Sequence, residues 1–523
     1  MGIRQLLQKY KKYLIISGTF FLLSIISFAT YKIFFQKQPP RNNFIVIIPN
    51  YVNGFDPGQK AHTSNAQGDR LFCCIHSALI STNENGDVLP QVATSWDKVE
   101  NEDAIIFTLR DDVLFHNGKK LTAQDVKFSF ERAKEKGNDE YAIIKSIETL
   151  ENDTKVKLKL QALPIFVYEL IAKYKILSKE SLEKDQTHNQ LEGLKIGSGP
   201  YQLIYEDSSN KIIKLGLFDK YFNKDKIKNS QKEIVFKVNS NYDTSLLQLE
   251  EGTVDAILDF PINKITNASN KKNIEVVQNK GAKCSVLFIN NNKVKKGKRE
   301  LIAQTLNIEK IIADLNLPVN PLKTFVPQGE IGHNENIQYA YDSNQNEVKN
   351  KVSLLSEKDK EIKLGASFKE IKEVVHKIKE QLQEVGFEVI VNIPESLTFF
   401  TNSKNGKYDI SFMSNMNEMP YGHKVLIDYM NPIFEKEGKQ TPKSHSHIQG
   451  DTTLKKLLDK TQTITDKNIY EQTVKDIQTH LYTNKYVVPF YQQNIYFLTS
   501  KKVQGLTCDP FTRTDFTQVK VSK

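Results

Sequence analysis

The sequence predicts an α/β protein built from two or three lobes. Its 523 residues exceed the roughly 250–300 residues that one hydrophobic core can serve. A composition of 39% hydrophobic and 26% charged residues is typical of a folded, soluble chain. Runs of β-branched residues alternate with segments of helical periodicity, and this β–α–β order implies a parallel sheet.

The first 41 residues differ in charge from the rest of the chain. They hold seven basic residues and no acidic one, so removing them from the 72 basic residues leaves 65 against 62 acidic residues. The body is therefore nearly neutral, with both signs interspersed. Because a nucleic-acid-binding protein concentrates positive charge on one surface, we expect no nucleic-acid partner.

The run Tyr13–Tyr31 contains nineteen residues and no charge. A helix of this length, at 1.5 Å per residue, can cross a hydrocarbon core of about 30 Å. The basic residues before it favour an inside N-terminus and an exported body. Two interpretations stay open: a signal peptide cleaved near Ser27 and Ala29, or an uncleaved signal anchor. The length of the apolar run favours the anchor, and the absence of Cys excludes a lipid-modified cysteine in this segment.

The exported body begins with a predicted strand over 42–50, a β-branched run closed by Pro and Asn. The alternation over 105–115 predicts a further strand, which the His-Asn-Gly sequence at 116–118 turns. Residues 121–137 then predict a helix. Thr122 is its expected N-cap and Asp125, three residues on, completes a variant of the capping box. These features favour a structural rather than a catalytic role for the segment.

The middle of the chain predicts alternating strands and helices. Residues 196–218 open with a Gly/Pro turn and continue as a β-meander, without the helix and spacing of a phosphate-binding loop. Residues 233–240 predict a strand, and 241–258 a helix leading into another strand. The strand pattern restarts at 284–292, and 298–315 is typical of helix.

The clearest helix signal lies in 367–393, where one apolar stripe recurs at spacings of three and four before Gly386 and a β-branched strand. The stripe consists of Phe368, Ile371, Val375, Ile378, Leu382 and Val385. Residues 454–498 predict closing helices and a strand that ends near Phe497. Residues 338–351 are polar and lack periodicity, so we expect the least order there.

Cysteine and histidine residues give no metal-binding pattern. The four cysteines match no zinc knuckle. The sequence leaves open whether Cys284 and Cys508 form a disulfide or stay free. His445 and His447 lie in a Ser- and Gly-containing stretch that is typical of an exposed loop, and His423 is nearby. We therefore expect no metal and no cofactor.

Several motifs, taken in order, resemble the extracytoplasmic solute-binding proteins of family 5, which serve oligopeptide, dipeptide and nickel ABC transporters. The resemblance spans 44–510 and is strongest to the peptide-binding members. The motifs are LPQVATSW (89–96), FTLRDDVLFHNGKKLTAQDV (107–126), GSGPY (197–201), LEEGTVDAI (249–257), KRELIAQTLNIEKI (298–311), KYDISFMSN (407–415) and VVPFYQQNIYF (487–497).

The resemblance implies the type II periplasmic-binding-protein fold, with two αβ lobes, a hinge and an extra subdomain in the first lobe. It places the first lobe at 42–283, with the subdomain at about 70–195. The second lobe would comprise 284–488, and 489–523 would return to the first. Residues 1–41 remain the signal anchor or signal peptide. Ligands of such proteins are trapped when the lobes close about the hinge.

The resemblance also implies a ligand site after the strand that contains Tyr408 and Asp409. Peptide-binding relatives meet the α-ammonium group with an aspartate, and Glu418 stands at the matching position. The expected ligand-binding residues are Asn415, Met416, Asn417, Glu418 and Met419. Asn415 replaces the tryptophan usual in the family, which bears on specificity.

The function implied is capture of peptides in an interlobe cleft and delivery to an ABC permease in the inner membrane. A monomer in the periplasm, tethered by residues 13–31 if these are not cleaved, is expected. Alternatives in the same fold are binders of a muropeptide, a nickel chelate or a haem chelate. An alternative of another class is a membrane-tethered exported hydrolase, although the sequence contains no G-x-S-x-G or H-E-x-x-H motif. We expect no catalytic residues.

Overall fold

The computed structural model describes most of the chain after its N-terminal segment. The described residues are 42–52, 54–59, 66–187, 190–338, 340–367, 372–416, 420–436, 439–440 and 444–522. Phe44 to Ser522 form one compact unit. Within these ranges no helix combines the length and the apolar character needed to cross a membrane. The predicted apolar segment Tyr13–Tyr31 lies outside them.

An eleven-stranded mixed sheet runs through this unit. β12 and β19 pair antiparallel at its centre. β13 also pairs with β19 but stands outside the linear strand order of the sheet. The strand order is β15 (Glu388–Asn392), β14 (Glu361–Ala366), β16 (Ile410–Met416), β12 (Ile274–Ile289), β19 (Val487–Ser500), β11 (Ala256–Ile257), β1 (Asn43–Ile48), β10 (Glu233–Val238), β9 (Ile212–Leu217) and β8 (Tyr201–Asp207), with β13 at Val319–Pro321.

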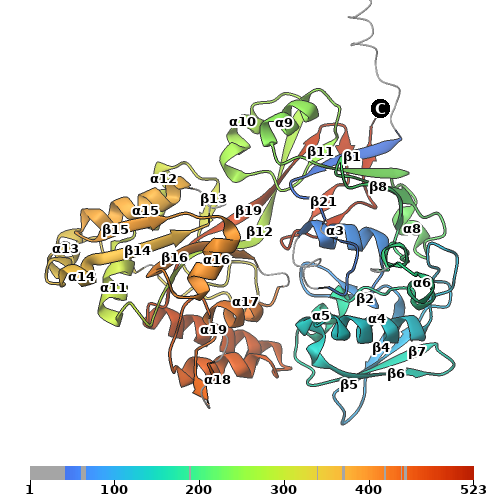
Figure 1. Ribbon diagram of the computed structural model, residues 1–523, viewed down its shortest axis with the longest axis horizontal. Coiled ribbons are helices and arrows are strands. Elements are labelled where there is room, and N and C mark those ends of the chain that lie inside the picture. The colour runs from blue at the N-terminus through green and yellow to red at the C-terminus, as the bar shows by residue number, and fades with distance from the viewer. Residues whose placement is uncertain are drawn as a thin grey trace, which may run out of the picture. The chain divides into compact units, whose positions relative to one another are not determined.

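The paired strands β12 and β19 connect the two ends of the sheet, as Figure 1 shows. Their pairing extends from Ile274 opposite Ser500 to Phe288 opposite Val487. The register shifts between Asn279 and Lys283. Gly281 lies in this irregular stretch, where a Cβ atom would come within 2.4 Å of the Gln493 carbonyl oxygen. The sequence predicted only the second half of β12, because its first half is polar.

At one end of the sheet, β1 and β11 run parallel, with Val46 opposite Ala256. Helix α9 (Tyr242–Glu250) precedes β11 in the chain, so the predicted helix–strand unit is confirmed. β8, β9 and β10 form the predicted antiparallel meander. Gly197, just before this meander, must be glycine because the backbone of Ile75 lies so close. A Cβ on Gly197 would lie 1.9 Å from the Ile75 carbonyl oxygen.

A separate four-stranded antiparallel sheet has its own core. Its order is β4 (Ala93–Lys98), β5 (Ala104–Leu109), β7 (Lys155–Leu160) and β6 (Ile144–Leu150). Helix α4 (Ala123–Glu135) packs against it and begins with the predicted capping box, in which the Thr122 amide donates to Asp125 Oδ2 over 2.9 Å.

The predicted strand over 105–115 is too long. β5 ends at Leu109, because the charged residues that follow are exposed or half-buried and leave the sheet. The chain then turns at Gly118, whose φ of 81° favours glycine. The amide of Phe115 donates to the Lys119 carbonyl oxygen across this turn.

At the other end of the sheet, β14 and β15 run parallel and are joined by α15 (Lys372–Glu384). Val375, Ile378 and Leu382 of the predicted stripe are fully buried and His376 is exposed, as expected. Phe368 and Ile371 lie outside the described residues. The predicted helical segment 298–315 consists of two helices, α11 (Lys296–Thr305) and α12 (Ile308–Asp314).

The expectation of little order over 338–351 is wrong for its second half. Helix α13 (Gln345–Ser353) begins after Asn344, whose side chain accepts the amide hydrogen of Glu347. Val348 and Val352, four residues apart, are fully buried in the adjacent core. Two apolar residues on one face therefore suffice to anchor this helix in the core, although the surrounding residues are polar.

The remaining elements are short or cover the sheets. The helices are α3 (Ala66–Ile75), α5 (Val167–Lys173), α6 (Lys179–Lys184), α7 (Leu191–Leu194), α8 (Lys224–Ile227), α10 (Ile265–Ser269), α14 (Glu357–Lys360), α16 (Ser396–Lys404), α17 (His423–Met430), α18 (Thr452–Thr461) and α19 (Lys467–Thr483), with 3₁₀ turns at Asp139–Ile143 and Ile262–Lys264. The short strands are β2 (Ile80–Thr82), β3 (Val88–Pro90), β17 (Glu435–Lys436), β18 (Lys439–Gln440), β20 (Val503–Gln504), β21 (Thr507–Cys508), β22 (Thr514–Asp515) and β23 (Lys520–Val521).

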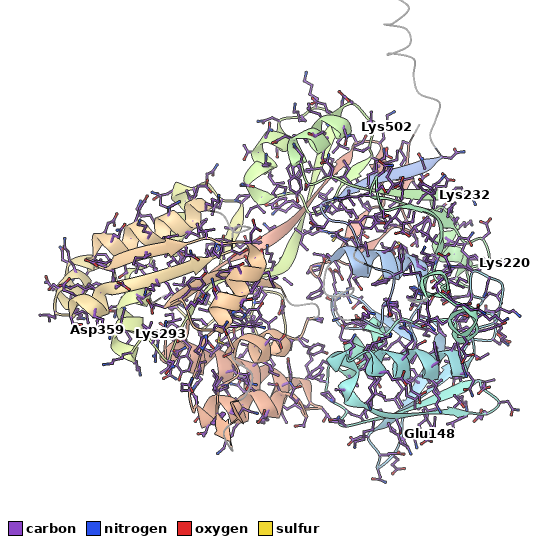
Figure 2. The ribbon with its side chains drawn as sticks, viewed as in Figure 1. Glu148, Lys220, Lys232, Lys293, Asp359 and Lys502 are labelled. Atoms are coloured by element: carbon purple, nitrogen blue, oxygen red, sulfur yellow. The ribbon has the colours of Figure 1, made fainter. Side chains whose placement is uncertain are left out.

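Charged side chains of both signs point outward from several elements. Glu148, Lys232, Lys293 and Asp359 are among those labelled at the edge of the view in Figure 2. This interspersed distribution agrees with the near-neutral charge of the body. All four cysteines are free thiols, and Cys284 and Cys508 are buried without forming the disulfide that the sequence left open.

Candidate ligand-binding site

A cavity of about 830 Å³ lies among α3, the β2–β3 turn, α5 and the C-terminal segment 507–517. Asn279 and Lys280, at the irregular stretch of β12, also line it. Ligand pockets in proteins usually measure roughly 300–1,000 Å³. The cavity is therefore large enough for a small peptide or a comparable solute.

Arg70 of α3 fixes two walls of the cavity relative to each other. Its guanidinium is fully buried and binds Asp259 through two hydrogen bonds, Nη1–Oδ2 at 2.6 Å and Nη2–Oδ1 at 2.8 Å. Its Nε donates to Thr514 Oγ1 over 3.0 Å. Burial opposes the charged guanidinium, but Asp259 outweighs this effect and the pKa of Arg70 rises. Arg70 thus joins α3 to the segment after β11 and to the C-terminal wall.

The described side chains that line the cavity carry balanced charge. Tyrosine and phenylalanine rings stand among them, including Phe72, Tyr141 and Phe511. The acidic members are Asp69, Glu84, Glu169, Asp509 and Asp515, and the basic members are Lys173, Lys175, Lys226, Lys280 and Arg513. Such a lining suits a polar ligand that carries both positive and negative groups.

Glu169 of α5 holds a buried carboxylate in this wall and is only 4% exposed. Its Oε2 accepts a hydrogen bond from Thr82 Oγ1 at 2.5 Å and lies 3.7 Å from Arg513 Nη1. Burial raises the pKa of Glu169, while the Thr82 hydroxyl and Arg513 oppose that rise. Arg513 also donates through Nε to Asp509 Oδ2 at 2.5 Å.

Lys175 and Cys73 form a second polar contact in the wall, with 3.3 Å between Nζ and Sγ. Burial raises the pKa of the Cys73 thiol, and Asp69 adds to the effect. The neutral thiol is therefore favoured near neutral pH, so the cysteine is a poor nucleophile. Nothing in this contact suggests covalent chemistry.

The predicted ligand-binding residues fall partly outside the described chain. Asn415 and Met416 end β16, where they pair with Cys284 and Lys283 of β12. Asn417, Glu418 and Met419 lie outside the described residues. The described structure resumes at Pro420, and Tyr421 forms a bridge with Ile331. Asn415 is 6% exposed, and its Nδ2 has no hydrogen-bond partner among the described residues.

Pro420 and Tyr421 lie close to the cavity wall that contains Glu169. A Cβ atom placed on Gly86, in the β2–β3 turn, would be 3.6 Å from Pro420 Cγ, from Tyr421 Oη and from Glu169 Oε1. The ring of Tyr421 also lies 6.2 Å from that of Phe166, which precedes α5. Pro420 and Tyr421 therefore lie near Gly86, beside the wall that contains Glu169.

The expectation that His445 and His447 occupy an exposed loop is wrong. Both are buried, and they converge on Ser403 of α16. His445 Nδ1 lies 2.9 Å from Ser403 Oγ, and His447 Nε2 lies 2.8 Å from the Ser403 carbonyl oxygen. Burial lowers the pKa of His445 to about 3, so this ring is neutral at physiological pH. His423 is the first residue of α17.

No set of three or more His, Cys, Asp or Glu side chains suited to holding a metal ion occurs in the described part of the chain. The sequence reasoning did not identify Glu169, Lys175 or Arg513 as cavity residues. They come from α5, the segment after it and the C-terminal segment. Their common wall arises from tertiary contacts, and no local spacing in the sequence signals it.

Comparison with known proteins places this chain in a family. The family described as "Bacterial extracellular solute-binding proteins, family 5 Middle" matches residues 87–432. The chain belongs to the bacterial extracellular solute-binding proteins of family 5. The resemblance inferred from the motifs is thus confirmed.

Two curated relatives illustrate the range of the family. The nickel-binding protein NikA of Staphylococcus aureus is 28% identical over 229 residues, which cover 43% of this chain and 44% of that protein. The matched segment therefore spans less than half of the length of NikA. The probable D,D-dipeptide-binding periplasmic protein DdpA of Escherichia coli K12 is 22% identical over 462 residues, 85% of this chain and 86% of that protein.

A solved structure confirms the fold. The ABC transporter-associated periplasmic binding protein DppA from Helicobacter pylori, in complex with the peptide STSA, superposes with a TM-score of 0.74. It shares 19% identity and covers 92% of this chain and 98% of its own. The predicted α/β periplasmic-binding-protein fold with two lobes is confirmed. The relatives named are described as binding proteins.

Proposed function

We propose that this protein is an extracytoplasmic solute-binding protein that captures peptides and delivers them to an ABC permease of the inner membrane. The observation that carries the proposal is the cavity of about 830 Å³, lined by five acidic and five basic side chains, on a family 5 fold. A free peptide carries an ammonium and a carboxylate group. Burying either group without an opposite charge costs several kcal/mol, so a site for peptides needs both signs.

Glu418 is the proposed partner of the peptide α-ammonium. Glu418 stands two positions after Met416 and two positions before Pro420 in the sequence. These described neighbours are anchored at β12 and near Gly86. Chain connectivity therefore supports a position of Glu418 beside the cavity wall. Asn415, Met416, Asn417 and Met419 complete the proposed contact segment.

The proposed mechanism is closure of two lobes about β12 and β19. The first lobe would comprise 42–283, with a subdomain at about 70–195, and the second 284–488, with 489–523 returning to the first. β12 and β19 pair along most of their length and connect both ends of the sheet. Small changes of φ and ψ near Gly281 would rotate one end against the other.

The proposed location is the periplasm, with a monomer tethered to the inner membrane by residues 13–31. The support for the tether is the uncharged run Tyr13–Tyr31 after a basic segment. The support for an extracytoplasmic body is the family, whose members are described as extracellular.

A second candidate ligand is a metal chelate. The similarity to the Staphylococcus aureus nickel-binding protein favours it. The cavity lysines Lys173, Lys175 and Lys280 would pair with the carboxylates of such a chelate. The peptide hypothesis differs from the chelate hypothesis because it requires recognition of an ammonium group.

Isothermal titration calorimetry tests the proposal directly. The full chain is titrated with pools of di- to pentapeptides, with a nickel–histidine complex and with haem. The proposal predicts saturable binding of at least one peptide pool with micromolar or tighter affinity. Binding of the nickel complex or haem, with no peptide binding, would contradict it.

A further inference from the structure

Glu169 is a buried acid, and one of its oxygens has no hydrogen-bond partner in the described part of the chain. Its Oε2 accepts from Thr82 Oγ1 and approaches Arg513. Its Oε1 is buried and has no hydrogen-bond partner among the described residues. A buried polar atom without a partner costs about 1–3 kcal/mol, and more for a charged group. Native proteins keep few such atoms, so this one calls for an explanation.

The neighbouring cations leave one oxygen of the Glu169 carboxylate without a hydrogen bond among the described residues. Arg513 and Lys173 both act on Glu169. Arg513 is shared, because its Nε binds Asp509 Oδ2 and its Nη2 donates to the Asn83 carbonyl oxygen. One guanidinium thus serves two carboxylates. Oε1 has no donor among the described residues, and a positively charged group that donates a hydrogen bond to it would give this carboxylate a stronger contact than a neutral donor.

The position of Glu169 relates it to the ligand rather than to the core. Glu169 lines the cavity. Its Oε1 lies near Gly86, as do Pro420 and Tyr421, which follow the proposed contact segment. Thr82 holds the other oxygen in place, so the carboxylate is oriented before any ligand arrives. A residue fixed in this way can select among ligands through one open acceptor atom.

We propose that Glu169 is a specificity-determining residue, whose Oε1 accepts a hydrogen bond from the ammonium or guanidinium group of a basic ligand side chain. The inference rests on the proposed peptide-binding function and adds a ligand class to it. Peptides that contain Lys or Arg are therefore the preferred ligands of this site.

Calorimetry with matched peptides tests the inference. The tripeptides Lys-Ala-Ala, Ala-Lys-Ala and Ala-Ala-Lys are compared with the same peptides acetylated at the lysine Nε, all with free α-amines. The wild-type protein should bind at least one lysine peptide about tenfold more tightly than its acetylated partner. The Glu169→Gln variant should reduce this ratio to within about twofold, with unchanged affinity for the acetylated peptide.

Two further variants keep the test sharp. Glu131→Gln removes an exposed acid of α4 and should preserve the tenfold ratio. Glu169→Asp retracts the carboxylate by one methylene and should lower the ratio even if the Gln variant does not fold. Equal binding of lysine and acetyl-lysine peptides by the wild type, or an unchanged ratio in both Glu169 variants, would overturn the inference and leave peptide binding intact. Absence of binding by all six peptides would overturn the proposed function itself.

Discussion

Asn415 of β16 and Cys284 of β12 are Cα partners in antiparallel register, and the amide of Asn415 is buried beside this pair. Its Nδ2 finds no hydrogen-bond partner among the residues that the structure describes. The position is the last described side chain before the segment that contains Glu418. Asn415 belongs to the proposed contact segment, in which its amide would donate to a peptide carbonyl group.

Replacing Asn415 by Ala should weaken peptide binding about five- to tenfold, since one hydrogen bond to the ligand is worth about 1 kcal/mol or more. The free energy of unfolding should change little, because Nδ2 makes no hydrogen bond within the described protein. Calorimetry and urea unfolding measure the two effects. Asn402→Ala is the control, because the Asn402 amide donates to Tyr408 Oη. The control should lose stability and keep its affinity; the reverse pattern would contradict a ligand role for Asn415.

The buried ion pair of Arg132 and Asp56 should be essential for stability. Its atoms meet in a bidentate geometry, Nη1–Oδ1 at 2.7 Å and Nη2–Oδ2 at 2.8 Å. Arg132→Gln removes the guanidinium from the buried Asp56 carboxylate and should lower the free energy of unfolding by about 3–5 kcal/mol. Arg110 offers a matched control, because it forms a bidentate pair with Asp112 at the exposed surface. Arg110→Gln should cost less than about 1 kcal/mol, and equal losses in urea unfolding would refute the distinction.

His445 should make stability fall with pH below about 6.5. Burial lowers the pKa of His445 to about 3 in the folded state, whereas an unfolded histidine has a pKa of about 6.5. The unfolded chain therefore binds the proton first as the pH falls. Between these values His445 should contribute a loss of about 1.4 kcal/mol per pH unit. His445→Gln should reduce the slope of unfolding free energy against pH between 6.5 and 4.5.

The surroundings of His445 support this assignment. Its ring stacks on Tyr429 and lies edge-on to Phe400, and Lys404 and His447 add positive charge nearby. His376→Gln is the control, since His376 is exposed on α15. An identical slope for the wild type and His445→Gln would contradict the lowered pKa of His445 in the folded state.

Sequence reasoning succeeded where the signal is local. The capping box of Thr122 and Asp125 and the apolar stripe of α15 depend on residues three or four apart. The capping box is present, and so is the part of the stripe that the structure describes, Val375 to Val385. The motif series, read in order, identified the family because it samples many positions of one fold.

Sequence reasoning failed where tertiary contacts decide. His445 has polar neighbours in the sequence, yet Ser403, Tyr429 and Phe400 from two helices enclose it. Glu169 resembles any acid in a short helix, and only the approach of Thr82 and Arg513 makes it a buried cavity residue. The role of Glu418 stays a prediction, because it lies outside the described residues.

Glu418→Gln should discriminate between peptides by their α-amines. The free-amine form of a bound peptide should lose about tenfold or more in affinity, because a neutral amide cannot offset the ammonium charge. The N-acetylated form should change by less than about twofold. Calorimetry of both peptides against both proteins gives the comparison. Equal losses for the two forms would remove Glu418 from its assigned role.

Native mass spectrometry of the protein, purified gently from its own host, tests the central claim most directly. The account predicts additional masses that dissociate as peptides and yield amino-acid sequences on fragmentation. Bound nickel chelate or haem, with no peptide in any charge state, would contradict it.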